Sequence, residues 1–380
     1  MKLFKCQSCQ QVLYFENSVC VKCGHRLGYV PEIATLSALE PDGNLWRALT
    51  APGGSYRFCA NAAQKACNWL VEASSPESFC LSCRHNRTIP DVTLPANLEA
   101  WQKIEIAKHR LFYSLLRLRL PMPTRVEDPA EGLAFDFLAE LPHLNAAPVT
   151  TGHDNGLITI SLAEADDAAR EQRRVAMHEP YRTLLGHFRH ETGHYFWDRL
   201  VRDRGRLDAC RAIFGDERQD YEQALQTYYN NGAPADWQSR FVSAYATAHP
   251  WEDFAETWAH YFHIVDTLET AGGFGLSLWP KVGKGMELAA RIDFDPHRAP
   301  LDRIIESWLP LTFAVNAINR SMGLPDLYPF VLAPPVIVKL AFLHRLIAAR
   351  GHPQARATGT STIRAIVASL RRPIGSPESG

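Results

Sequence analysis

The segment His190–His194 has two histidines four positions apart, with a glutamate directly after the first. On a helix, this spacing places His190 and His194 one turn apart on one face, where both can bind one Zn²⁺ ion. Such an ion would lower the pKa of a bound water, and Glu191 would take the proton as general base. The pattern therefore predicts a catalytic zinc site for hydrolysis. A polar helix face without metal fits the same three fixed positions.

Large apolar side chains around this segment predict that its helix packs into a core while the histidines face a cleft: Phe188, Tyr195, Phe196, Trp197 and Leu200. A buried His-Glu-His stripe without metal would be costly, because its polar groups would lose their hydration. His187 lies on the same stripe, three residues before His190. We expect His187 to line the cleft or to support a ligand rather than to bind the metal.

A catalytic zinc ion needs a third protein ligand and an open position for water. Pro250 can open a helix on which Glu252 and Glu256 lie one turn apart on one face. We expect Glu252 to bind the metal and Glu256 to accept an N–H from a liganding histidine, which fixes its tautomer. Two alternatives stay open. Asp253 or Glu256 could be the ligand, or Glu252 and Asp253 could simply favour the helix N-terminus.

The two segments together, His190–His194 and then Glu252–Glu256 with the form E-x-F-A-E, resemble the gluzincin metallopeptidases, which include anthrax lethal factor. This resemblance implies that Glu252 is the third ligand and Glu256 its neighbour in the second shell. It also implies a tyrosine seven residues before the ligand, where Tyr245 stands, whose phenol would donate to the developing oxyanion. Tyr245 could equally be a core aromatic residue.

A longer resemblance rests on four further segments: Ile158–Ile160, Glu164–Asp167, Tyr181–Arg189 and Cys59–Cys83. Through them most of the chain is similar to a bacterial family of zinc-binding metallopeptidases with an N-terminal zinc ribbon. The resemblance implies a mainly α fold. It would be an α+β zincin-like catalytic domain with a small edge-strand sheet, preceded by small cysteine zinc modules. It also implies a peptidase activity that is itself mainly inferred for the family.

Eight of the nine cysteines form two groups of four. The first group has two C-x-x-C knuckles, with Gly24 after the second to make the tight turn: Cys6, Cys9, Cys20 and Cys23. This spacing predicts a zinc ribbon, because so short a module has too little core to fold without a metal. Unpaired or disulfide-bonded cysteines are the alternative. Cys210 is left over and is expected to be a buried thiol.

The second group is less regular and predicts another four-cysteine zinc site, with His85 as a substitute ligand: Cys59, Cys67, Cys80 and Cys83. Neither cysteine site keeps an open position, so both are expected to be structural. The cofactors expected are therefore one catalytic and two structural zinc ions. Cysteines with metal-ligand spacing favour a reducing compartment over disulfides.

The composition and the ends of the chain suggest a cytoplasmic protein. The 380 residues carry a formal net charge of -1, so the whole chain offers no electrostatic footprint for nucleic acid or an anionic membrane. The N-terminus lacks an apolar signal run, and prolines interrupt the apolar stretch Leu327–Ala349. We therefore expect no export signal and no membrane span.

Several elements can be predicted around these motifs. Apolar residues recur at three- and four-residue steps across Leu98–Leu118, which predicts a helix. Gly156–Leu162 alternates apolar and polar residues behind a turn, which predicts an edge strand where a peptide could pair. Asp166–His178 is expected to be a polar helix, and Pro180 suits the first position of another.

Four domains are expected. A zinc ribbon spans 1–35, a second four-cysteine module spans 36–95, the metallopeptidase domain spans 96–350, and a disordered tail spans 351–380.

Two classes of function fit the sequence. The first is a peptidase acting on a peptide or protein, with the ribbon recruiting substrate or partner. The second is a zinc-stabilised module that binds protein or nucleic acid through a mildly basic ribbon, with an inactive H-E-x-x-H site. Hydrolysis of a substrate other than a peptide is a further option, because a zinc-activated water is not selective by itself.

Overall fold

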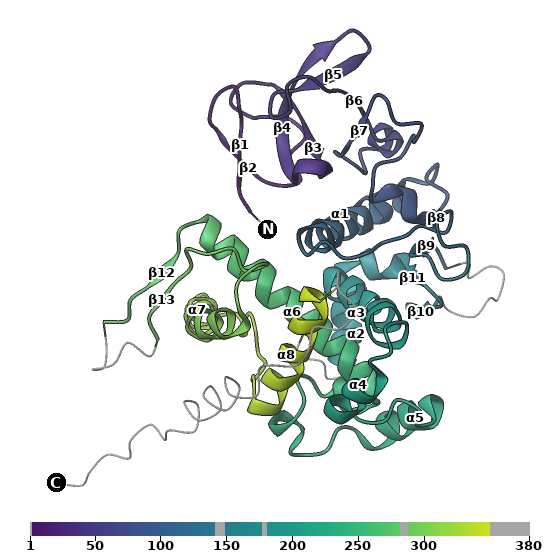
Figure 1. The fold of residues 1–380 in the computed structure, drawn as a ribbon, viewed down its shortest axis with the longest axis vertical. Coiled ribbons are helices and arrows are strands. Elements are labelled where there is room, and N and C mark those ends of the chain that lie inside the picture. Colours follow the sequence, from purple (N-terminus) through teal and green to yellow (C-terminus); the bar gives the residue numbers. More distant parts are fainter. Residues whose placement is uncertain (1, 141–148, 177–180, 282–287, 350–380) are drawn as a thin grey trace.

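The computed structural model describes residues 2–140, 149–176, 181–281 and 288–349, in which helices predominate as expected (Figure 1). The predicted tail, the end of the predicted helix at His178, and Pro180 lie outside the described residues. No helix among the described residues is long and apolar enough to cross a membrane.

The N-terminal part is made of short strands. β1 and β2 form a two-stranded ribbon, and the other five strands form an antiparallel sheet in the order β3-β4-β5-β6-β7. The strands are β1 (Phe4–Lys5), β2 (Val12–Leu13), β3 (Arg26–Val30), β4 (Thr35–Asp42), β5 (Leu45–Ala48), β6 (Ser55–Phe58) and β7 (Leu70–Glu72). The domain boundary expected after residue 35 falls where β3 pairs with β4, from Arg26 opposite Leu39 to Val30 opposite Thr35. The division into four domains stays a prediction, and its first two members share this sheet.

The rest of the chain is mostly helical. Its helices are α1 (Pro95–Arg117), α2 (Asp167–Ala176), α3 (Leu184–Trp197), α4 (Leu207–Phe214), α5 (Tyr221–Asn231), α6 (Pro250–Gly273), α7 (Leu301–Ser321) and α8 (Pro334–Ala348). A short π-helix, Asp198–Arg202, continues α3, and β12 (Ser277–Leu278) pairs with β13 (Ala290–Arg291). The helix predicted over Leu98–Leu118 is confirmed as most of α1.

A second sheet lies beside these helices, in the order β10-β11-β9-β8. Its strands are β8 (Asn86–Thr88), β9 (Ala134–Leu138), β10 (Gly152–Asp154) and β11 (Leu157–Ser161). The strand predicted around residues 156–162 is present as β11, but its expected place at the edge is wrong. β11 pairs with β10 on one side and with β9 on the other, so among the described strands β10 and β8 lie at the two edges. The alternation of side chains could not reveal this, because it reports burial of one face and not pairing.

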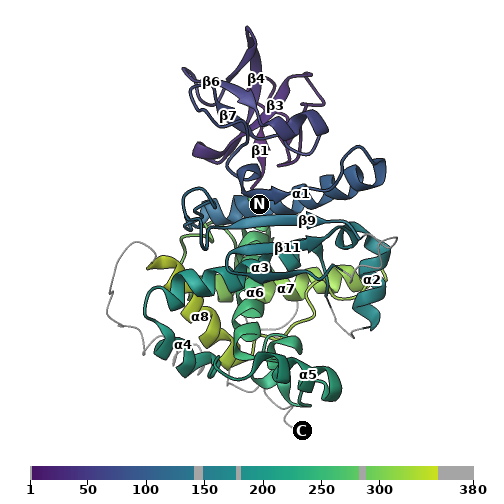
Figure 2. The same ribbon diagram turned by 90° about the vertical axis from the view of Figure 1, so that its right-hand side faces the viewer.

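α1 connects the N-terminal strands with the helical part. The ring of Phe15 lies 5.4 Å from that of Tyr113 on α1, and Trp69 packs against the same aromatic group. Figures 1 and 2 show the N-terminal sheet on one side of α1 and the other helices on the opposite side. One hydrophobic core therefore runs from the ribbon through α1 into the helical part.

The helices α3 and α6 carry the predicted metal ligands and pack closely against each other. α3 begins after Thr183, whose side chain accepts a hydrogen bond from the Gly186 N–H at 3.0 Å. α6 begins at Pro250, as predicted, after His249, whose Nδ1 accepts from the Trp251 N–H at 3.1 Å. These caps fix where each helix starts, and so they fix which side chains face the partner helix.

Candidate metal centre

The structure brings His190, His194 and Glu252 together between α3 and α6. The Nε2 atoms of the two histidines lie 3.2 Å apart. The Glu252 carboxylate lies 2.9 Å from the His190 Nε2 through Oε2, and 3.5 Å from the His194 Nε2 through Oε1. Three ligands of a tetrahedral zinc ion with bonds of about 2.0 Å would lie roughly 3.3 Å apart. The donor set and its spacing therefore fit zinc.

Two hydrogen bonds connect this cluster to neighbouring residues. The His190 Nδ1–H donates to Glu256 Oε1 at 2.7 Å, and the hydroxyl of Ser243 donates to Glu256 Oε2 at 2.5 Å. The Tyr221 hydroxyl donates to Glu252 Oε1 at 2.6 Å. The sequence predicted Glu256 in this role, but nothing in the local pattern pointed to Tyr221, at the start of α5, or to Ser243, two residues before the 3-10 helix Tyr245–Thr247.

Charges within the cluster are strongly coupled. Burial alone would lower the pKa of His190, but hydrogen bonds to Glu252 and Glu256, and their charges, raise it well above its usual range. Burial alone would raise the pKa of Glu252, but the charge of His194 and the hydrogen bonds from both histidines lower it well below its usual range. The Glu252 carboxylate is thus held ionised although it is almost fully buried. A bound cation would stabilise this buried negative charge.

A cleft of about 460 Å³ opens beside the cluster, and Glu191, His187 and Tyr245 line it. Among the described residues, none forms a hydrogen bond or an ion pair with the Glu191 carboxylate. Tyr245 lies in a short 3-10 helix, Tyr245–Thr247, with its ring 5.9 Å from that of His190. His187 lies outside the cluster, and its Nδ1 contacts Glu164 at 2.9 Å.

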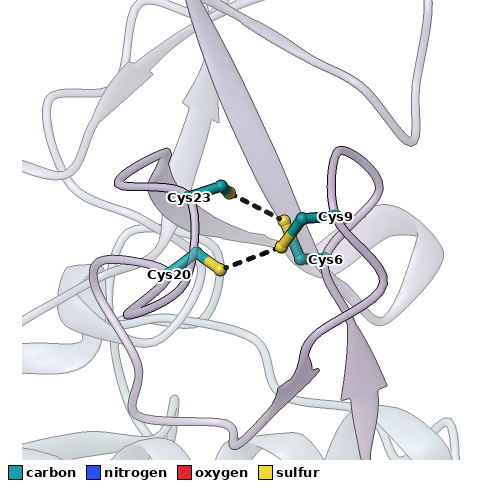
Figure 3. Close-up of side chains that lie close together, drawn as sticks. All are labelled: Cys6, Cys9, Cys20 and Cys23. Carbon is teal, nitrogen blue, oxygen red and sulfur yellow. Dashed lines mark hydrogen bonds between the residues drawn. The ribbon is translucent and has the colours of Figure 1, made fainter.

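The first cysteine group converges between the loop that joins β1 to β2 and the segment that precedes β3 (Figure 3). The sulfur atoms of Cys6 and Cys23 lie 3.6 Å apart, and those of Cys9 and Cys20 lie 3.5 Å apart. Four sulfurs around a tetrahedral zinc ion with bonds of about 2.3 Å would be separated by roughly 3.8 Å. The thiols are free of disulfides, and the group fits zinc.

The second cysteine group also converges, and α1 supplies a histidine to it. Cys67 lies 3.7 Å from Cys80, sulfur to sulfur, and the Nε2 of His109 lies 3.2 Å from the Cys67 sulfur and 3.6 Å from that of Cys83. His85, expected as a substitute ligand, is not among the described residues that converge here. Its Nδ1 is hydrogen-bonded to the Leu133 carbonyl at 2.8 Å. His85 was chosen because it follows Cys83 closely in the sequence. Long-range packing of α1 instead places His109 beside the cysteines. Cys210 is buried, as expected.

A buried polar network ties α1 and α3 to α6. Arg189, next to His190 on α3, forms an ion pair with Asp266, and Ser114 on α1 donates to the same carboxylate at 2.6 Å. Tyr113 donates to Glu269 one turn further along α6, at 2.8 Å. This network fixes the helix that follows the second cysteine group against the two helices of the metal cluster.

Comparison with known proteins relates both parts of the chain to zinc-binding families. Residues 97–346 match the family described as "putative zinc-binding metallo-peptidase", and residues 3–94 match a zinc-ribbon domain. Uncharacterized proteins of Mycobacterium tuberculosis and Mycobacterium bovis are each 44% identical to this chain over 351 residues, which cover 91% of this chain and 95% of each relative. No solved structure matches. A zinc ribbon followed by a zinc-binding peptidase domain defines the class, and the chain belongs to this zinc-binding metallopeptidase family.

Proposed function

We propose that this protein is a zinc peptidase of the gluzincin type, with His190, His194 and Glu252 as the ligands of one catalytic zinc ion. The observation that carries the proposal is the convergence of two imidazoles and one buried carboxylate at tetrahedral spacing, beside a cleft. The packing of α3 against both α6 and the strand β10 supports it.

Zinc, when bound, would act as a Lewis acid toward the substrate carbonyl and would acidify water. The chain's own residues would handle the protons. Glu191 lines the cleft and has no partner among the residues that the structure describes, so its carboxylate is available to take a proton from the attacking water and to return it to the leaving amine. The Tyr245 phenol, beside His190, would donate a hydrogen bond to the oxygen that gains charge.

The position of the edge strand β10 is an argument for a peptide substrate. Within the described part of the chain, its backbone pairs with β11 on one side only, and it lies against α3, with His153 stacked 6.2 Å from His194. An extended peptide that paired with β10 would run past the metal cluster.

The test is a zinc count combined with a cleavage assay. We expect three zinc ions per chain in wild type, one for each donor group, and two in the His190→Ala, His194→Ala double variant. Wild type is expected to cleave an unfolded protein, and the double variant is not. Two zinc ions in both proteins, without cleavage, would contradict the proposal and would favour a zinc-stabilised binding module.

A further inference from the structure

We propose that Tyr221 is a positioning residue that restricts Glu252 to one metal-binding oxygen. The inference rests on the proposed function, because it takes Glu252 as a zinc ligand. It concerns a residue on α5, a helix that shares no part of the H-E-x-x-H or E-x-F-A-E segments.

The contacts divide the two oxygens of Glu252 between different partners. Oε1 accepts a hydrogen bond from the Tyr221 hydroxyl at 2.6 Å, and Oε2 lies 2.9 Å from the His190 Nε2. The Glu252 side chain is only 1% exposed, so water cannot replace the tyrosine readily. Oε2 is therefore the oxygen nearest a ligand histidine, while Oε1, which lies 3.5 Å from the His194 Nε2, is engaged by the tyrosine hydroxyl.

The surroundings of Tyr221 hold its hydroxyl in this place. α5 begins at Tyr221, after Asp220, whose carboxylate accepts from the Gln223 N–H at 2.9 Å. The tyrosine ring packs edge-on against Trp251 at 5.7 Å and against His249 at 5.2 Å. Trp251 directly precedes Glu252 on α6, and His249 caps the start of that helix, so the tyrosine and its acceptor are positioned by the same first turn.

This arrangement matters because a free carboxylate can bind a metal ion through both oxygens. A catalytic zinc site keeps one position open for water, and a second carboxylate oxygen would compete for that position. A hydrogen bond to Oε1 engages the oxygen that would otherwise approach the metal. It also orients the ligand, and loss of such an outer partner typically lowers metal affinity about 10- to 100-fold.

The experiment compares Tyr221→Phe with wild type in a titration with a zinc chelator such as dipicolinate, with zinc per chain as the readout. Tyr221→Phe keeps the ring and removes only the hydroxyl. Tyr229→Phe removes a hydroxyl from the same helix and serves as the matched control. The His190→Ala variant identifies which zinc loss belongs to the cluster, and the two cysteine groups report whether the fold as a whole is disturbed.

We expect Tyr221→Phe to lose the cluster zinc at a roughly 10- to 100-fold lower chelator concentration, while Tyr229→Phe follows wild type. The zinc held by the cysteines should resist the chelator equally in wild type, Tyr221→Phe and Tyr229→Phe. Equal sensitivity of the cluster zinc in Tyr221→Phe and wild type would overturn the inference alone. A wild type with only the two cysteine-held zinc ions would overturn the proposed function, and the inference with it.

Discussion

The imidazole of His190 on α3 donates its Nδ1–H to the Glu256 carboxylate on α6, across 2.7 Å. A carboxylate can only accept here, so a proton lies on Nδ1, and Nε2 is the ring nitrogen that faces Glu252 and His194 and would bind a metal there. Ser243 binds the other oxygen of Glu256 and fixes its plane. The tautomer needed for metal binding is thus set by a residue that does not itself contact the metal position.

Removing this support should weaken zinc binding without removing a ligand. We expect Glu256→Ala to lower the zinc affinity of the cluster about 10- to 100-fold. Glu256→Gln should have a smaller effect, because its amide oxygen can still accept from His190. A chelator titration measures both variants. Unchanged affinity in Glu256→Ala would show that the hydrogen bond does not prepare the ligand.

Replacing the general base should separate metal binding from catalysis. Glu191→Gln keeps the size of the side chain but cannot take a proton at neutral pH. We expect three zinc ions per chain and a loss of cleavage of at least about 100-fold. Zinc analysis and a cleavage assay on the same preparation check this. Turnover close to wild type would exclude Glu191 from the role.

The second cysteine group should depend on its cysteines and not on His85. We expect Cys83→Ser to lose one zinc ion per chain and to unfold at a lower temperature, because this cluster abuts His109 on α1. His85→Asn should keep the full zinc content, because His85 is bonded to the Leu133 carbonyl and not to the cluster. Loss of zinc from His85→Asn would return that histidine to the ligand set.

Glu164 should make stability depend on pH in acid. Burial alone would raise its pKa, but hydrogen bonding and charge from His187 and Arg182 lower it to about 2. A lowered folded-state pKa contributes stability above the ordinary carboxyl value of about 4.3, and this is lost as pH falls from there toward 2. We expect Glu164→Gln to cost on the order of 3 kcal/mol at pH 7 and less at each step below pH 4.5.

Urea unfolding of both proteins across this pH range measures the difference. Acid removes zinc from both proteins alike, so the comparison isolates the carboxylate. A cost of Glu164→Gln that stays constant down to pH 3 would contradict the assignment.

The sequence predicted the parts of the site that depend on short-range spacing. His190 and His194 share a helix face because a helix repeats every 3.6 residues, and the knuckles at Cys6 and Cys20 are equally local. Tyr221 and His109 were missed, because each reaches its site only after a separate helix has packed there. The order of strands around β11 was missed for the same reason: pairing is a long-range property.

Gly193, inside the H-E-x-x-H segment, lies at a close approach of α3 to α6. A Cβ atom at this position would lie 2.8 Å from the Cα of Ala255 and 3.2 Å from both its Cβ and its carbonyl oxygen. Ala255 stands between Glu252 and Glu256, so this close approach lies beside the cluster. The close atoms are two backbone atoms and an alanine Cβ, and none of them can rotate away as the end of a flexible side chain would.

We therefore expect Gly193→Ala to push the helices apart, to destabilise the protein by about 1–3 kcal/mol, and to weaken binding of the cluster zinc. Alanine favours a helix over glycine by about 1 kcal/mol, so helix propensity alone would predict the opposite sign. Gly273→Ala on α6 is the matched control, because its Cβ would meet Leu3 only at 3.5 Å and 3.8 Å, which is ordinary contact. Chemical unfolding and a chelator titration of both variants decide the matter. If Gly193→Ala unfolds and loses its cluster zinc at the same denaturant and chelator concentrations as Gly273→Ala, the prediction is wrong. The helices could then separate without moving Glu252 from the histidines.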